Sequence, residues 1–175
     1  MDLFLFICTF IHNQRIHAVC KSPLGILRKM HSYPISGITY PFLEILCIHF
    51  LYFFHIPLPE YHLVKDFYDT VGKCLETPCS PEINTGMFAA MFEMQDIFGA
   101  FVGHDHDNDY IVAKQGIALG YGRFSGDDTI YHNIPSGVRV IELEEGKRGF
   151  VSWILEDDGR ITDPMTFTDG KVVPL

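Results

Sequence analysis

The sequence has no CxxC pair, few basic residues for its acidic content, and no uncharged apolar run of about 18–20 residues. The five cysteines therefore lack zinc-site spacing, and their odd number and wide scatter do not indicate a disulfide framework. Thirteen Lys and Arg stand against 22 Asp and Glu, and the net charge of −9 argues against binding to a nucleic-acid backbone. The missing apolar run argues against a clean transmembrane helix.

The length and composition of the chain are sufficient for one globular domain. The 175 residues are 47% hydrophobic, which excludes a disordered chain and leaves little room for two domains. Residues 1–59 hold four basic and two acidic residues, whereas residues 60–175 hold nine basic and twenty acidic ones. We therefore interpret residues 1–50 as an apolar, poorly patterned leader of doubtful relation to the domain that follows.

Neither the amino-terminal segment nor the cysteines identify the cellular compartment of the protein. Met1–His12 is apolar but lacks the basic start of a secretory signal, so the sequence does not decide between a cytoplasmic and an extracytoplasmic protein. Membrane association through residues 1–54 is the less favoured alternative. Cys74 and Cys79 are close enough in sequence to pair in an oxidising compartment, but two thiols are the favoured interpretation.

The pattern becomes orderly near Leu51. An apolar run predicts a buried strand over 51–54, and helical spacing predicts a short helix over 61–71 and a second one, capped by Asn84 or Thr85, over 87–97. Further strands are expected over 99–102, 110–113, 116–120, 138–143 and 150–155. This order predicts layers of an α/β fold, with the carboxyl-terminal strands closing a second sheet.

The most informative stretch is Gly103–Asp109, which reads GHDHDND. Two histidines at i and i+2 follow a buried strand directly, and imidazoles and carboxylates are common metal ligands. Three acidic residues and two histidines in six positions would repel one another in a packed core. We therefore expect this loop to lie in water or around a cation, and we favour metal binding over a solvated loop.

His55 is the second candidate ligand. It follows an apolar strand and precedes a Pro-x-Pro turn. Alone, such a histidine is more often a hydrogen-bonded structural residue. Ligands gather at the carboxyl ends of adjacent strands in α/β sheets, so His55 and His104 are expected to be neighbours that share a metal.

Other features are weaker. The glycines at 116, 120, 122 and 126 fit no phosphate-binding motif and indicate bends and turns. Arg123 is more often a surface or ion-paired arginine than a phosphate ligand. Six histidines have no partner at ligand spacing and are interpreted as incidental: His12, His17, His31, His49, His62 and His132.

Two segments resemble a known family. Phe53–Tyr61 (FFHIPLPEY) and Phe101–Tyr110 (FVGHDHDNDY) resemble the last two motifs of calcineurin-like metallophosphoesterases, most of all the purple-acid-phosphatase-like or Icc-type phosphohydrolases. The resemblance runs from about Leu51 to Ile154. It identifies residues 51–175 as the carboxyl-terminal part of such a domain.

The resemblance implies an α/β/β/α four-layer sandwich with a two-metal site. His55 and His104 would bind one metal and His106 the other, with iron, manganese or zinc as the ions. Asp105 and Asp107 would support the ligands or face solvent. The implied activity is hydrolysis of a phosphomonoester or phosphodiester by a metal-activated water. No catalytic residue is identified, and the substrate-binding residues are unknown.

The sequence also departs from the family. The motifs Asp-x-His, Gly-Asp-x-x-Asp and Gly-Asn-His-Asp/Glu are absent from residues 1–54, so the N-terminal strands that would carry them are missing or replaced. Three histidines without a bridging carboxylate would hold one metal weakly or none. The alternative to an active phosphoesterase is therefore a truncated, catalytically inactive remnant that acts at most as a binding module.

Overall fold

A computed structural model describes residues 9–11, 15–18, 50–66, 69–126 and 133–175. These residues form ten strands, one α-helix and one 3₁₀ helix. The strands are β1 (Thr9–Ile11), β2 (Arg15–Ala18), β3 (Phe50–Phe53), β4 (Ile97–Val102), β5 (Ile111–Lys114), β6 (Ile117–Tyr121), β7 (Gly137–Glu144), β8 (Phe150–Glu156), β9 (Ile161–Thr168) and β10 (Lys171–Pro174). The helices are η1 (Pro59–Asp66) and α1 (Met87–Met94).

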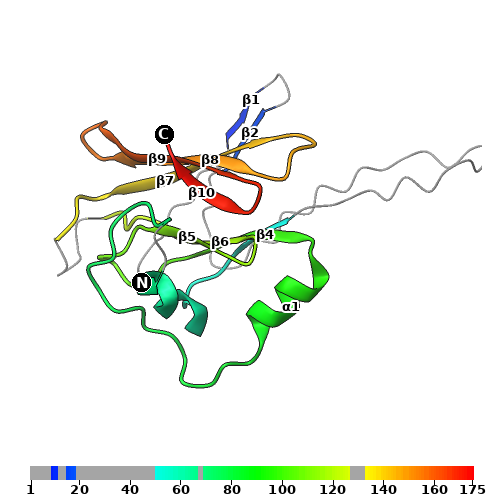
Figure 1. The fold of residues 1–175 in the computed structure, drawn as a ribbon. Helices are drawn as coiled ribbons and strands as arrows, with labels where there is room; N and C mark the ends of the chain where they lie inside the picture. The colour runs from blue at the N-terminus through cyan, green and yellow to red at the C-terminus, as the bar shows by residue number, and fades with distance from the viewer. Residues whose placement is uncertain (1–8, 12–14, 19–49, 67–68, 127–132) are drawn as a thin grey trace, which may run out of the picture.

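The strands make two sheets that stack face to face (Figure 1). The first has the order β3-β4-β6-β5, in which β3, β4 and β6 are parallel and β5 is antiparallel. The second has the order β1-β2-β7-β8-β9-β10 and is antiparallel throughout. The fold is thus a sheet-rich mixed α/β fold, and the second sheet confirms the expected carboxyl-terminal strands.

Two apolar cores lie between three layers, which are the second sheet, the first sheet and the helices. One core lies between the sheets and includes Phe101 of β4 and Phe150 of β8, whose rings are 5.5 Å apart. The other lies between the first sheet and the helices, where Phe88 and Met91 of α1 pack against β4 and β6. The strand β4 is buried at every position because both of its faces are covered. The strand β4 is therefore packed on both of its faces.

Two local predictions need correction. The short helix predicted over 61–71 is present as a 3₁₀ helix over Pro59–Asp66, and the Tyr61 hydroxyl fixes it by donating to Ala100 O at 2.8 Å. The helix α1 is preceded by Gly86, which has a φ of +79° and no capping side chain. Asn84 Oδ1 instead accepts the Gly86 N–H at 2.9 Å, so the asparagine shapes the turn before the helix.

No helix among the described residues is both long enough and apolar enough to cross a bilayer. The strands β1 and β2 form a hairpin, and β2 pairs with β7 over Arg15–Ala18. Residues 1–8, 12–14 and 19–49 of the predicted leader lie outside the described residues. The domain boundary at residue 50 stays a prediction.

Candidate functional site

The candidate site lies where β3 and β4 end. The two strands are parallel, with Phe53 opposite Phe101, and Gly103 N donates to His55 O at 3.0 Å just beyond the last pair. This register places His55 and His104 beside each other. His55 Nε2 lies 3.3 Å from His104 Nδ1, and the two rings meet edge to face. The structure thus brings together two of the three predicted ligands.

The backbone at His104 turns sharply. Its φ is +75°, in the left-handed region that non-glycine residues seldom occupy. Such a conformation costs roughly 1–2 kcal/mol for an L-residue, and the surrounding loop must hold it. The turn directs the chain away from β4 within one residue, and the imidazole remains next to His55.

Asp105 is buried and is held by two other segments. Both carboxylate oxygens accept the backbone N–H of Cys79, at 3.2 and 3.1 Å, and Oδ2 accepts the Tyr121 hydroxyl at 2.6 Å. Burial raises the pKa of Tyr121 far above its ordinary value, and its bond to Asp105 raises it further. Tyr121 therefore stays a hydrogen-bond donor to this carboxylate.

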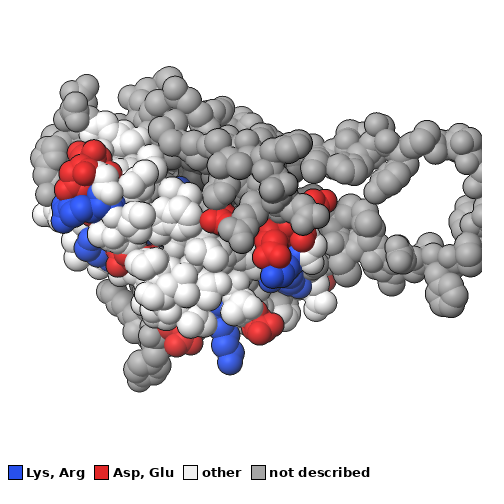
Figure 2. Space-filling view, turned by 90° about the horizontal axis from the view of Figure 1, so that it is seen from above, with Lys and Arg blue, Asp and Glu red and all other residues white. Residues whose placement is uncertain are grey.

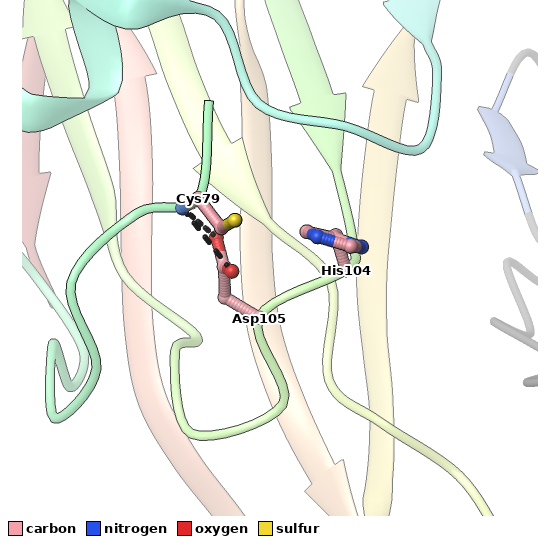
Figure 3. A group of neighbouring side chains, drawn as sticks. All are labelled: Cys79, His104 and Asp105. Carbon is pink, nitrogen blue, oxygen red and sulfur yellow. Dashed lines mark hydrogen bonds between the residues drawn. The ribbon is translucent and has the colours of Figure 1, made fainter. Parts of the chain in front are cut away.

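Cys79, His104 and Asp105 form a compact group of potential ligands (Figure 3). One donor atom from each lies within 4.8 Å of the other two. This is the one such group of three or more among the described residues. From the sequence Cys79 was expected to be a thiol, with a disulfide to Cys74 as the alternative, because nothing in its spacing relates it to a histidine 25 positions away.

His106 is not a member of this group. Its ring stacks on Phe124, with 6.0 Å between centroids and 18° between planes. Phe124 follows β6, so this contact places the imidazole beside the segment that leaves that strand. The role of His106 as the third ligand stays a prediction.

The remaining polar side chains of the loop are buried. Asp107, Asn108 and Asp109 are 4%, 1% and 0% exposed. The solvated alternative was therefore wrong, because the Val71–Glu76 segment pairs with the loop and supplies neutral donors. The expectation of a cation stays a prediction. Glu76 N donates to Asn108 Oδ1 at 3.1 Å and Lys73 N donates to Asp109 Oδ1 at 2.5 Å. Asp107 Oδ2 accepts the side chain of Asn133.

Two buried arginines complete this network. Arg123 Nη2 contacts Asp109 Oδ2 at 2.5 Å, and Nη1 lies 3.6 Å from Glu156 Oε1. Arg139 donates to the backbone carbonyl oxygens of Tyr121 and Asp109. The prediction that Arg123 is ion-paired is confirmed. Arg139 points into the interior, where buried carbonyl groups need its donors.

The donor set fits one metal ion better than two. Two imidazoles on one ion, at bond lengths of about 2.0–2.1 Å, have nitrogens roughly 3.0–3.4 Å apart, and the His55–His104 separation of 3.3 Å matches this spacing. Asp105 and Cys79 offer two further donors near His104. A second ion would need ligands around His106, and no group of three is found there among the described residues.

The remaining histidines and the two cysteines of the sequence analysis either make ordinary contacts or lie outside the described residues. His62 Nε2 lies 3.0 Å from Ser80 Oγ, and His17 is on β2. Cys74 and Cys79 are both thiols, as favoured. Four histidines lie outside the described residues: His12, His31, His49 and His132.

The fold and the site together define a mixed α/β domain whose parallel strands end in a cluster of histidine, aspartate and thiol groups. Comparison with curated proteins finds relatives that carry one family name. The chain is 35% identical over 108 residues to probable inactive purple acid phosphatase 14 of Arabidopsis thaliana, with 59% of the chain and 26% of that protein aligned. It is 38% identical over 106 residues to probable inactive purple acid phosphatase 29 of the same plant, covering 57% of the chain and 26% of that protein.

The chain therefore carries a purple acid phosphatase-like region, which confirms the resemblance found in its motifs. A third relative, probable inactive purple acid phosphatase 28, is 33% identical over 55% of the chain. The chain spans about a quarter of the length of these curated relatives. No family model matches the chain, and no solved structure gives a significant match.

Proposed function

We propose that this chain is a purple acid phosphatase-like module without phosphoesterase activity of its own, able to bind a single metal ion around His104. The observation that carries the proposal is the single compact group of potential ligands among the described residues, Cys79, His104 and Asp105. The three relatives, all of which are named inactive, support the same conclusion.

Repulsion between two metal ions limits what these side chains can hold. A two-metal site holds two cations about 3.5–4 Å apart, and the metals act by clamping the attacking and leaving oxygens of the ester. Two divalent ions at that distance repel strongly unless a carboxylate bridges them. Asp105 is held by Cys79 N and Tyr121, and Asp107 Oδ2 by Asn133, so hydrogen bonds already engage both aspartates. The one group of three potential ligands among the described residues supports a single ion.

The second candidate is a metal-dependent phosphoesterase for phosphomonoesters or phosphodiesters. The contact between His55 and His104 favours it, because this pair at adjacent strand ends is the arrangement that the resemblance implies. When bound, a metal would supply an activated water and a Lewis acid for the ester oxygen. In this alternative His55 and His104 hold one ion of iron, manganese or zinc, and His106 holds another.

The architecture of the complete domain is part of the proposal. The outer face of the second sheet carries Val140, Trp153 and Leu155, which are only partly covered. Figure 2 views the molecule from this side, and its described centre is largely uncharged, with Lys, Arg, Asp and Glu gathered toward the margins. A helical layer on this face would complete an α/β/β/α sandwich. Residues 51–175 would then be the carboxyl-terminal part of that domain.

An assay with metal analysis tests the proposal. The purified chain is supplied with iron, manganese or zinc, its metal content is measured, and hydrolysis of p-nitrophenyl phosphate and of bis-p-nitrophenyl phosphate is followed. We expect one metal ion per chain and no turnover above the His104→Ala variant. Two metal ions per chain, together with turnover that His104→Ala and His106→Ala both abolish, would establish the phosphoesterase instead.

A further inference from the structure

The group formed by Cys79, His104 and Asp105 brings a thiol next to the candidate metal site (Figure 3). We propose that Cys79 is a metal ligand, and that the three side chains bind one zinc-like ion through sulfur, imidazole nitrogen and carboxylate oxygen. This inference rests on the proposed function in one respect, since it concerns a single ion. It assigns His55 a different part from the one implied by the family resemblance.

The chemistry of the donors selects the ion. Thiolate is a soft ligand that favours zinc, whereas magnesium, calcium and manganese prefer sites made of oxygen donors. One thiolate, one imidazole and one carboxylate leave a fourth tetrahedral position for water. Because Cys79 is exposed and His104 is partly exposed, an ion can reach the group from solvent. On binding, the thiol releases its proton to water, and no electron transfer is involved.

Burial of Asp105 gives an independent reason for a cation here. Its side chain is among the buried charged groups, at 3% exposure. The hydrogen bonds described for it come from neutral donors, the Cys79 backbone and the Tyr121 hydroxyl. A buried carboxylate is costly unless a positive charge compensates it, and an ion next to Cys79 and His104 would supply that charge.

Hydrogen bonds in the structure already hold part of the proposed site in position. Asp105 binds the backbone N–H of Cys79, so two of the three ligands are fixed relative to each other. The donors lie within 4.8 Å of one another, and tetrahedral zinc needs about 3.3–3.6 Å between ligand atoms at its usual bond lengths. Side-chain rotation closes that difference without movement of the backbone.

His55 acts as a positioning residue in this arrangement. In this assignment the contact between His55 Nε2 and His104 Nδ1 is a hydrogen bond and not the spacing of two co-ligands, so His104 Nε2 would be the ligand atom. Hydrogen-bond partners behind a metal-bound histidine fix its orientation, and their loss typically weakens metal binding about 10–100-fold. The inference therefore separates a ligand, Cys79, from a supporting residue, His55.

Cobalt substitution tests the ligand assignment on the full chain under reducing conditions. Cobalt(II) bound by a thiolate shows an intense sulfur-to-metal charge-transfer absorption in the near ultraviolet. We expect this band in the unmodified protein and in Cys74→Ser, the matched control, and its loss in Cys79→Ser. The cysteines at 8, 20 and 47 are present in all three proteins, so the comparison isolates Cys79. The His55→Gln variant should keep the band and need about tenfold more cobalt to reach it.

Alkylation gives a second readout without any substitution. Zinc should slow the reaction of Cys79 with iodoacetamide, measured by peptide mass mapping, while magnesium at the same concentration should not. A charge-transfer band that persists in Cys79→Ser, cobalt binding without a band, or equal alkylation rates with and without zinc would each overturn the inference. Phosphoesterase turnover would overturn the proposed function but would change none of these spectral and labelling results.

Discussion

The Nη2 atom of Arg123 lies 2.5 Å from the Oδ2 atom of Asp109, and neither side chain is exposed to solvent. This ion pair ties the end of the histidine-containing loop to the segment that follows β6. Glu156 of β8 approaches the same guanidinium, so the pair also connects the loop to the second sheet. The acidic loop is thus anchored to the protein interior through its last aspartate.

Removing one partner of this pair should destabilise the domain strongly. Asp109→Ala leaves Arg123 without its closest counter-charge, and loss of one partner from a buried ion pair costs about 3–5 kcal/mol. Arg123→Ala should cost more, because it leaves both Asp109 and Glu156 buried. Urea denaturation of the two variants and of the double variant measures the coupling between them.

The double variant should be less destabilised than the sum of the two single variants. The exposed pair of Lys147 and Glu144 provides the control, and Lys147→Ala should change the free energy of unfolding by no more than about 0.5 kcal/mol. Additive effects of Asp109→Ala and Arg123→Ala would show that the two side chains do not stabilise each other.

The left-handed backbone at His104 predicts a difference between two substitutions that both remove the imidazole. Glycine adopts a φ of +75° without steric cost, whereas alanine retains the cost of an L-residue. His104→Gly should therefore be more stable than His104→Ala by about 1 kcal/mol. Thermal or urea denaturation of the matched pair checks this, and an equal or lower stability of the glycine variant would contradict the backbone argument.

Three buried tyrosines predict a loss of stability at alkaline pH. Burial is the largest cause that raises the pKa values of Tyr61, Tyr110 and Tyr121 above the ordinary value of about 10. Above pH 10 the unfolded chain loses protons that the folded chain keeps, so rising pH favours unfolding. Denaturation midpoints should be unaffected by these groups below pH 9 and should fall above pH 10.

Ultraviolet absorbance of tyrosinate provides the direct measurement. These three hydroxyls should ionise only together with unfolding, and Tyr121→Phe should reduce by one the number of tyrosines that ionise in that step. Reversible ionisation of all eight tyrosines near pH 10 in the folded protein would contradict the prediction.

The close contact between the β5–β6 turn and the β9–β10 turn predicts that a larger residue at Gly170 destabilises the domain. A Cβ added at Gly170, in the β9–β10 turn, would lie 2.9 Å from Gly116 Cα in the β5–β6 turn. Gly146, in the β7–β8 turn, has a similar φ but open space around it. Gly170→Ala should therefore be less stable than Gly146→Ala by about 1–3 kcal/mol, the usual cost of overpacking. Equal losses in a denaturation comparison would mean that the two turns separate readily.

The strands were predictable because their chemistry is local. Alternation over 138–143 and 150–155 foretold β7 and β8, and the apolar run before His55 foretold β3. The neighbourhood of His55 and His104 also followed from a general rule for parallel strands. These inferences needed only periodicity and the place where a strand stops.

The missed features all depend on distant segments. The burial of Asp109 requires Lys73 N and Arg123, which lie 36 and 14 positions away. The place of Cys79 beside Asp105 depends on how the chain between β3 and α1 crosses the strand ends. No spacing in one sequence carries that information. The burial of the acidic loop was therefore not predicted, and Cys79 was expected to be a thiol without a role at the site.

The loop that presents His104 owes its shape to Arg123 and to the Val71–Glu76 segment, and none of these bonds involves an imidazole. The bonds that fold this loop are therefore separate from the side chains that could bind an ion. Substitution of an imidazole leaves the supports of the loop untouched, so the fold and any chemistry at the strand ends can change independently.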